Sequence, residues 1–354
     1  RPNLNFCAPI SGTVTHISRG QKRSLGYIVI AREGERTKEF RLPQLSDADG
    51  VRRLLLESGQ WPAFCSRPFE RIPEPDAQPA AIFVSAMDTE PLSAEPADLL
   101  RQESEALRTG LEAVRILTKG PLFVCQAPGA PIAGDIEGVK YVEFAGPHPA
   151  GLPGTHIHHL MPVGRRRHVW HIGYQDIIAI GRLFKTGRIW TKRIVSLAGP
   201  AVREPCLVRT CMGADLNDLV ANRCVAGKVN VISGSPLSGR PARFLSRYHI
   251  QVSAFPHKWD WRDQSFFARL VKALGDDKTG AIIPIAAHES VMPFNILPVP
   301  LLRALSVGDA ETAERLGCLE LAESDVALLT HVCPSKTDYA PLLRKVLDEV
   351  EKWT

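Results

Sequence analysis

Short apolar runs alternate with helical patterns along residues 80–200, and this alternation constrains the fold more than any other feature of the chain. The strand candidates are the runs 80–86, 122–125, 139–144, 168–172 and 189–197. Leucines and valines recur at helical spacing after Pro96, and a second helix is predicted for residues 175–184. Because parallel strands need long, usually helical, crossovers, the pattern predicts an α/β domain with a largely parallel sheet.

The flanking segments have different periodicities. Residues 13–17, 27–31 and 39–42 are short β-rich runs separated by glycines, and a helix is predicted from Ser46 to just before Gly59. Residues 201–258 give a compact β-α-β-β pattern of the β-grasp type. The tail is helical, with Asp309 as the first residue of one helix and Thr337 or Asp338 opening the last one.

Composition limits the classes of function. The chain has 354 residues, of which 44% are hydrophobic and 23% charged, and no apolar run reaches the roughly 18 residues that cross a bilayer. The net charge of +5 is spread along the chain, so nucleic acid is not expected as a partner. The 8 cysteines form no C-x-x-C pair, which favours reduced thiols and no structural disulfides.

The stretch GPHPAGLPGTHIHHLMPVG, residues 146–164, is rich in histidine, glycine and proline. Zinc is one interpretation, but a helix starting near Pro153 would place His156 and His159 on one face and His158 on another. We therefore predict no metal site. The glycines instead favour a tight loop that holds a polar ligand at a helix N-terminus, with the candidate residues Gly146, His148, Gly151, Gly154 and Thr155.

Nucleotide-binding signatures are incomplete. No G-x-G-x-x-G follows a strand, and GSPLSGRP at 234–241 has the glycine spacing of a P-loop without its Lys-Ser/Thr. We predict a hairpin-like turn there.

Several long motifs carry a family resemblance. GPHPAGLPGTHIH, GYQDIIAIGRLFKTG, VSLAGPAV, LVRTCMGADL, ISGSPLSG, NILPVPLLRAL and GDAETAERLGCLEL resemble, in collinear order, the NqrA subunit of the sodium-translocating NADH:quinone reductases (Na⁺-NQR). The resemblance implies a peripheral subunit on the cytoplasmic side of the bacterial inner membrane. Its implied partners are the other five subunits of the complex, especially the membrane subunits B and C, together with ubiquinone as substrate. The complex passes electrons from NADH to ubiquinone and exports sodium ions.

The resemblance also implies a domain order. It comprises a barrel-sandwich module (1–42, its N-terminal part expected to be missing), a Rossmann-like α/β domain (43–200), a β-grasp domain of the SLBB type (201–258) and a helical domain (259–354). No carrier lysine is present, so no covalent lipoate or biotin is expected. The segment 255–283 is shorter than the family pattern, and His159 replaces a residue that is more often aromatic. FAD, FMN, riboflavin and the iron-sulfur centres are assigned to other subunits, and no tightly bound cofactor is expected here.

The family is related to the flavin-binding subunit of respiratory complex I, which has a glycine-rich loop after its first helix. Here the corresponding segment is SGQWPAFCSRPFER, residues 58–71, in which bulky side chains replace the glycines. A quinone ring needs apolar walls and a few donors, so the candidate quinone-binding residues are Trp61, Phe64, Arg67, Phe69 and Arg71.

Alternatives to that interpretation remain open at the sequence level. The aromatic residues of segment 58–71 would simply fill the vacated flavin pocket, and the arginines would be solvated. A related alternative makes the whole chain a structural scaffold of the same complex with an empty relic nucleotide domain. A third is a stand-alone zinc hydrolase that uses His156 and His158.

Overall fold

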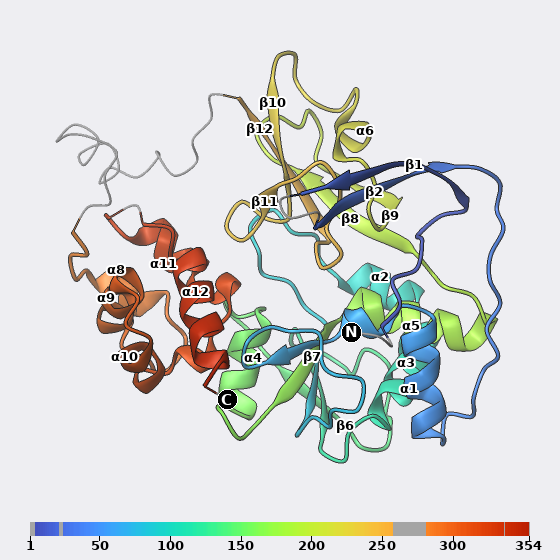
Figure 1. The fold of residues 1–354 in the computed structure, drawn as a ribbon, viewed down its shortest axis with the longest axis horizontal. Helices are drawn as coiled ribbons and strands as arrows, with labels where there is room; N and C mark the ends of the chain where they lie inside the picture. The colour runs from blue at the N-terminus through green and yellow to red at the C-terminus, as the bar shows by residue number, and fades with distance from the viewer. Residues whose placement is uncertain (1–3, 21–23, 258–280, 336, 354) are drawn as a thin grey trace.

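A computed structural model describes residues 4–20, 24–257, 281–335 and 337–353. Figure 1 shows an α/β region, a second sheet with a β-hairpin beside it, and a group of C-terminal helices in orange and red. The α/β multidomain class predicted from the sequence is therefore observed.

The sheet of the α/β region has five strands. Across the sheet they are β3 (Cys65–Arg67), β7 (Val169–Gly173), β4 (Ile82–Ser85), β5 (Leu122–Gln126) and β6 (Val139–Glu143). β7, β4, β5 and β6 are mutually parallel, and β3 pairs antiparallel with β7 at the edge. The four parallel strands fall on runs predicted from the sequence.

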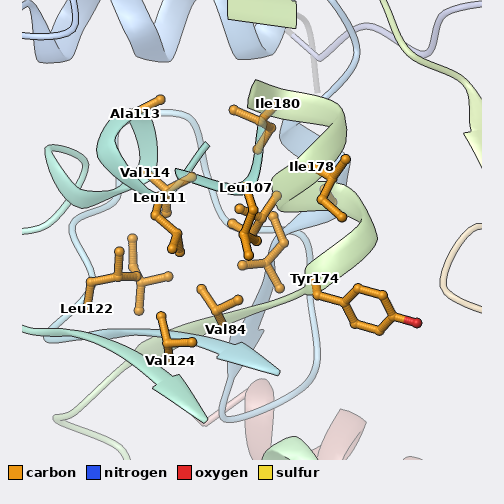
Figure 2. Packing of buried hydrophobic residues seen from close by; sticks show 14 of the residues in the cluster. Val84, Leu107, Leu111, Ala113, Val114, Leu122, Val124, Tyr174, Ile178 and Ile180 are labelled. Atoms are coloured by element: carbon orange, nitrogen blue, oxygen red, sulfur yellow. The ribbon is translucent and has the colours of Figure 1, made fainter. Parts of the chain in front are cut away.

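Helices cover both faces of this sheet. They are α1 (Ala48–Glu57), α2 (Ala97–Gln102), α3 (Ser104–Arg115), α4 (Pro153–Leu160) and α5 (Tyr174–Thr186). In β4, Ile82 and Val84 pack with α1, α3 and α5, while Phe83 points to the opposite face and packs with α4. Figure 2 shows the first of these packing layers, in which Val84 and Val124 meet Leu107, Leu111 and Ile178. Burial on both faces explains why these strands read as continuous apolar runs.

The pair α3 and α5 packs closely through two glycines. A Cβ added at Gly181 would lie 1.7 Å from the carbonyl oxygen of Ala106, and one added at Gly110 would lie 2.1 Å from that of Ile177. No side chain fits at either position, so both glycines are required for this helix contact.

The second sheet corrects one expectation. Its order is β11 (Arg240–Pro241), β10 (Val229–Ser233), β12 (Gln251–Pro256), β8 (Lys192–Ala198) and β9 (Cys206–Cys211), with α6 (Leu216–Val220) beside it. We expected the run 189–197 to continue the parallel sheet, but β8 pairs with β9 and β12 instead. α5 is the last helix that packs on the first sheet, and it ends at Gly187, which has a left-handed φ of 68°. From there the chain continues into β8 of the second sheet.

The N-terminal segment forms a hairpin of β1 (Gly12–Arg19) and β2 (Leu25–Arg32). The predicted third run, 39–42, is not a strand, because Glu39 makes only an isolated bridge with Arg188. The barrel-sandwich and β-grasp assignments stay predictions. The turn at 234–239 joins β10 to β11, as predicted for GSPLSG.

The C-terminal helices enclose a separate apolar core. They are α8 (Ala286–Ser290), α9 (Pro298–Val307), α10 (Ala310–Arg315), α11 (Ala327–Val332) and α12 (Tyr339–Glu351), with short 3-10 turns at Cys318–Glu320 and Glu323–Val326. Asp309 and Asp338 cap α10 and α12, which confirms the predicted helix starts. The predicted boundary at 258/259 and most of the short segment 255–283 lie outside the described residues.

Candidate functional site

The aromatic residues predicted to line a quinone site are mostly in the core. Trp61 and Phe64 are fully buried and pack with Trp170, with ring centroids 5.3 to 5.6 Å apart. The indole nitrogen of Trp61 donates to the carbonyl oxygen of Pro73 at 2.9 Å. Phe69 is also buried, but in the core of the C-terminal helices.

The two predicted arginines bind acidic residues of the tail. Arg67 is 1% exposed and donates to Asp325 at 3.1 Å. Arg71 contacts Asp348 and Glu351 of α12, both at 2.7 Å. Segment 58–71 therefore connects the α/β region to the C-terminal helices through ion pairs. Its five predicted residues do not line one cavity together.

The predicted polar-ligand loop makes contacts within the protein. The Gly151 amide donates to Thr89 Oγ1 at 2.8 Å, and His148 Nδ1 lies 3.4 Å from the same oxygen. Thr155 donates to the Pro149 carbonyl at 2.9 Å. Gly154 lies against Asp325, whose carboxylate oxygens are 2.4 Å from where its Cβ would be. Gly146 has a φ of 130°, which favours glycine.

The three histidines of α4 have separate partners. His156 is fully buried and its Nε2 donates to the Ala150 carbonyl at 2.9 Å. His158 Nδ1 donates to Glu320 at 2.7 Å, and its Nε2 accepts from the Asn295 amide at 3.1 Å. His159 lies beside the Phe144 ring. The imidazoles do not converge on one point, so the interpretation as a zinc hydrolase loses its geometric basis.

A cavity of about 400 Å³ opens at the place in the first sheet where the order of the strands reverses. From β4 the chain continues to β5 and β6 on one side, whereas β7 lies on the other side of β4. Ser85 ends β4, Gly173 ends β7, and both line the cavity. In open α/β sheets, ligands bind at this switch point beyond the carboxyl ends of the strands. The location makes this cavity, hereafter the switch-point cavity, the candidate functional site.

One wall of the switch-point cavity comes from the segment singled out in the sequence. Ala63, Cys65, Glu70 and Ile72 line it, while the predicted Phe64 does not. Strand alternation explains the difference: Cys65 pairs with His171 on the face toward α4, and its neighbour Phe64 points to the opposite core. Segment 58–71 therefore lines this cavity through residues next to the predicted ones, and its assignment to a quinone site stays a prediction.

Titratable groups cluster on that wall. Donor atoms of Cys65, Glu70 and His171 all lie within 4.8 Å of one another, a set that has metal-ligand chemistry. However, Glu70 already pairs with Arg67, and it accepts from His171 at 2.7 Å. Burial alone would raise the pKa of Glu70, but the Arg67 guanidinium and then His171 hold it well below its usual range. Burial raises the pKa of the Cys65 thiol well above its usual value, so the thiol is neutral.

Two residues that line the same cavity carry unsatisfied donors. Nε and Nη2 of Arg247 and the hydroxyl of Ser85 are buried and have no hydrogen-bond partner among the described residues. Asp176 is the nearest carboxylate to Arg247, at 3.9 Å, but it is held by Arg193. Leaving buried donors unpaired costs free energy, and such groups in a cavity indicate a site for a ligand that accepts hydrogen bonds.

Sequence reasoning missed Arg247, Tyr248 and Ser85. The loop before β12 carries the first two over the end of the α/β sheet from a different region of the chain, and no local pattern reveals that contact. A signal was available only for Ser85, which ends the predicted strand 80–86 at the carboxyl edge of a parallel sheet.

Among the described residues, no helix has the length and apolarity to cross a membrane.

Comparison with solved structures supports the fold. The NAD⁺-reducing [NiFe]-hydrogenase in its air-oxidized state has a chain of similar fold, with a TM-score of 0.50 and 13% identity. The similarity covers 82% of this chain and 61% of that chain. At this identity the likeness concerns the fold alone.

Comparison by sequence is much closer. Residues 46–189 match the family described as NqrA second alpha/beta domain, and residues 194–243 match the family described as NQRA C-terminal domain. The NqrA protein of the Na(+)-translocating NADH-quinone reductase of Actinobacillus pleuropneumoniae is 44% identical over 390 residues, covering 99% of this chain and 86% of that protein. The NqrA protein of Pseudomonas aeruginosa is 43% identical over 383 residues, covering 99% of this chain and 85% of that protein. With identity of this level along nearly its whole length, the chain belongs to the NqrA family, one of the subunit families of the Na⁺-translocating NADH-quinone reductases.

Proposed function

We propose that this chain is a peripheral subunit on the cytoplasmic side of the complex, where it helps to bind and reduce ubiquinone and to assemble the complex for sodium export. It carries no tightly bound cofactor or metal of its own, and electrons reach the quinone from redox groups of other subunits. It docks on the membrane subunits B and C. The quinone headgroup occupies the switch-point cavity.

The unsatisfied donors of Arg247 and Ser85 carry this proposal. A quinone headgroup is a flat ring with two carbonyl acceptors, and it fits a cavity that offers a few donors between apolar walls. Tyr174, Ile172 and Ile250 supply such walls here. Arg247 would donate to one carbonyl and stabilise the negative charge that develops on this oxygen during reduction.

Titration of the isolated chain with a water-soluble, short-chain ubiquinone analogue tests the proposal. Arg247→Gln should weaken binding about tenfold or more, because a hydrogen bond from a charged donor is lost. Ser85→Ala is a cleaner test, since the hydroxyl has no partner among the described residues and its removal breaks no internal hydrogen bond there. Arg223→Gln is the matched control, because Arg223 is exposed and its side chain, among the described residues, donates only to the Leu219 carbonyl.

The main alternative is a scaffold without a quinone site. In that case the Arg247→Gln and Ser85→Ala variants would bind the analogue as the Arg223→Gln control does, or no variant would bind it, while the complex still assembles. Thermal unfolding of each variant would establish that it is folded before the affinities are compared.

A further inference from the structure

A large cavity lies away from the switch-point cavity, in a groove where four segments of the chain meet. It has a volume of about 930 Å³. Its walls are residues 7–11 before β1, residues 32, 34–38 and 40 at and after the end of β2, residues 188–192 leading into β8, and residues 209–211 at the end of β9. We call it the basic groove.

Positive charge is concentrated on its walls. They carry six basic side chains and one acidic one, although the whole chain has a net charge of only +5. Arg32 pairs with Glu35, and Arg188 pairs with Glu39. Among the described residues, the other four basic side chains have no ion-pair partner, and all four are exposed: Arg36, Lys38, Lys192 and Arg209.

The floor of the basic groove is apolar. Ile10, Phe40, Ile189 and Trp190 line it, and Phe40 is 8% exposed. Lys38 reaches over the Phe40 ring, with its Nζ 4.7 Å from the ring centroid. The groove therefore combines a rim of cations with an apolar base, which suits a ligand that has both acidic and apolar side chains.

A strand edge borders the same groove. β9 is the last strand of the second sheet and pairs only with β8 among the described strands. Arg209 lies on β9, next to Thr210 and Cys211, which also line the groove. An open edge offers backbone donors and acceptors to an extended chain.

We propose that the basic groove is a docking surface for an acidic, extended polypeptide segment of another subunit of the complex. Charge complementarity selects an acidic partner, and the apolar floor and the β9 edge select a polypeptide. A small anion would need buried, convergent donors, whereas Lys38, Lys192 and Arg209 are exposed on the rim. A flat membrane surface would not enter the groove to contact its partly buried apolar residues, such as Trp190.

Binding of a labelled short peptide of alternating glutamate and valine to the isolated chain tests the proposal directly. The triple variant Lys38→Gln, Lys192→Gln, Arg209→Gln should bind about tenfold more weakly, as expected for the loss of several exposed charge pairs, and the wild-type affinity should fall with salt. The matched control removes three exposed arginines elsewhere, Arg101, Arg223 and Arg303, and should retain the affinity.

The assembled complex provides the second measurement. The groove variant should dissociate from the other subunits at a lower salt concentration than either the wild type or the control variant. Equal peptide affinity in the groove and control variants would overturn the proposal. So would binding of the wild type to anionic lipid vesicles without binding to the peptide, because the surface would then serve a membrane. Neither result depends on quinone binding.

Discussion

Arg67 and Asp325 are 258 positions apart in the sequence and form a buried ion pair of 3.1 Å, with side chains that are 1% and 0% exposed. Arg67 also contacts Glu70, and the backbone of Gly154 approaches Asp325 so closely that no side chain fits between them. Two segments of the α/β region, residues 67–70 and the start of α4, therefore meet the C-terminal helices at one point, next to the switch-point cavity.

Arg67→Ala should destabilise the folded chain by about 3–5 kcal/mol, because Glu70 and Asp325 would be left as buried charges without their partner. Urea unfolding followed by circular dichroism measures this change. The exposed Arg303 gives the comparison variant, Arg303→Ala, for which a change of less than ~0.5 kcal/mol is expected. Similar losses in the two variants would contradict the assignment of Arg67 as the link between regions.

His156 should make stability depend on pH. Burial lowers the pKa of His156 to about 4, whereas an unfolded histidine has a pKa of ~6.5. Because the unfolded state then binds more protons, the contribution is fully present above ~6.5 and is lost as pH falls toward 4. The expected loss between pH 7.5 and pH 5 is about 2 kcal/mol.

The His156→Gln variant isolates this effect. Its amide nitrogen retains a donor for the Ala150 carbonyl but does not titrate. Unfolding curves at pH 7.5 and pH 5 should differ less for the variant than for the wild type. His249, whose pKa burial also lowers to about 4, will leave part of the pH dependence in place. An unchanged difference in the variant would show that His156 is not responsible.

The purified chain should contain no stoichiometric zinc. His156 and His158 are bound to Ala150 and Glu320, and the carboxylate of Glu70 is paired with Arg67, so the nearby donor groups are committed to other partners. Elemental analysis measures the metal directly, and His156→Ala should leave the metal content unchanged. A content near one zinc per chain that falls in this variant would refute the prediction.

Phe64 and Phe69 should matter for stability rather than directly for quinone affinity. Replacing Phe64 by alanine leaves a cavity in the Trp61–Trp170 cluster and should cost about 3–5 kcal/mol. Phe64→Leu fills most of that volume and should keep the quinone affinity of the wild type, in contrast to Arg247→Gln. A selective loss of quinone affinity in the folded Phe64→Leu variant would return Phe64 to the site.

The local structure was largely predictable. The helix predicted from Ser46 to just before Gly59 is α1, which Asp47 caps, and Gly59 follows its end with a φ of 67°. The parallel strands and the caps at Asp309 and Asp338 were likewise predicted. Caps, turns and apolar periodicity depend on residues a few positions apart, so the sequence contains the interactions that set them.

Tertiary structure alone decided which side chains share the switch-point cavity. Phe64 and Cys65 are neighbours in the chain, yet strand alternation and the pairing with β7 send them to opposite faces of the sheet. Arg247 reaches the end of β4 only because β8 joined the second sheet and brought the loop before β12 over the first. Such contacts depend on strand partners and register between segments far apart in sequence, and no periodicity within one segment specifies them.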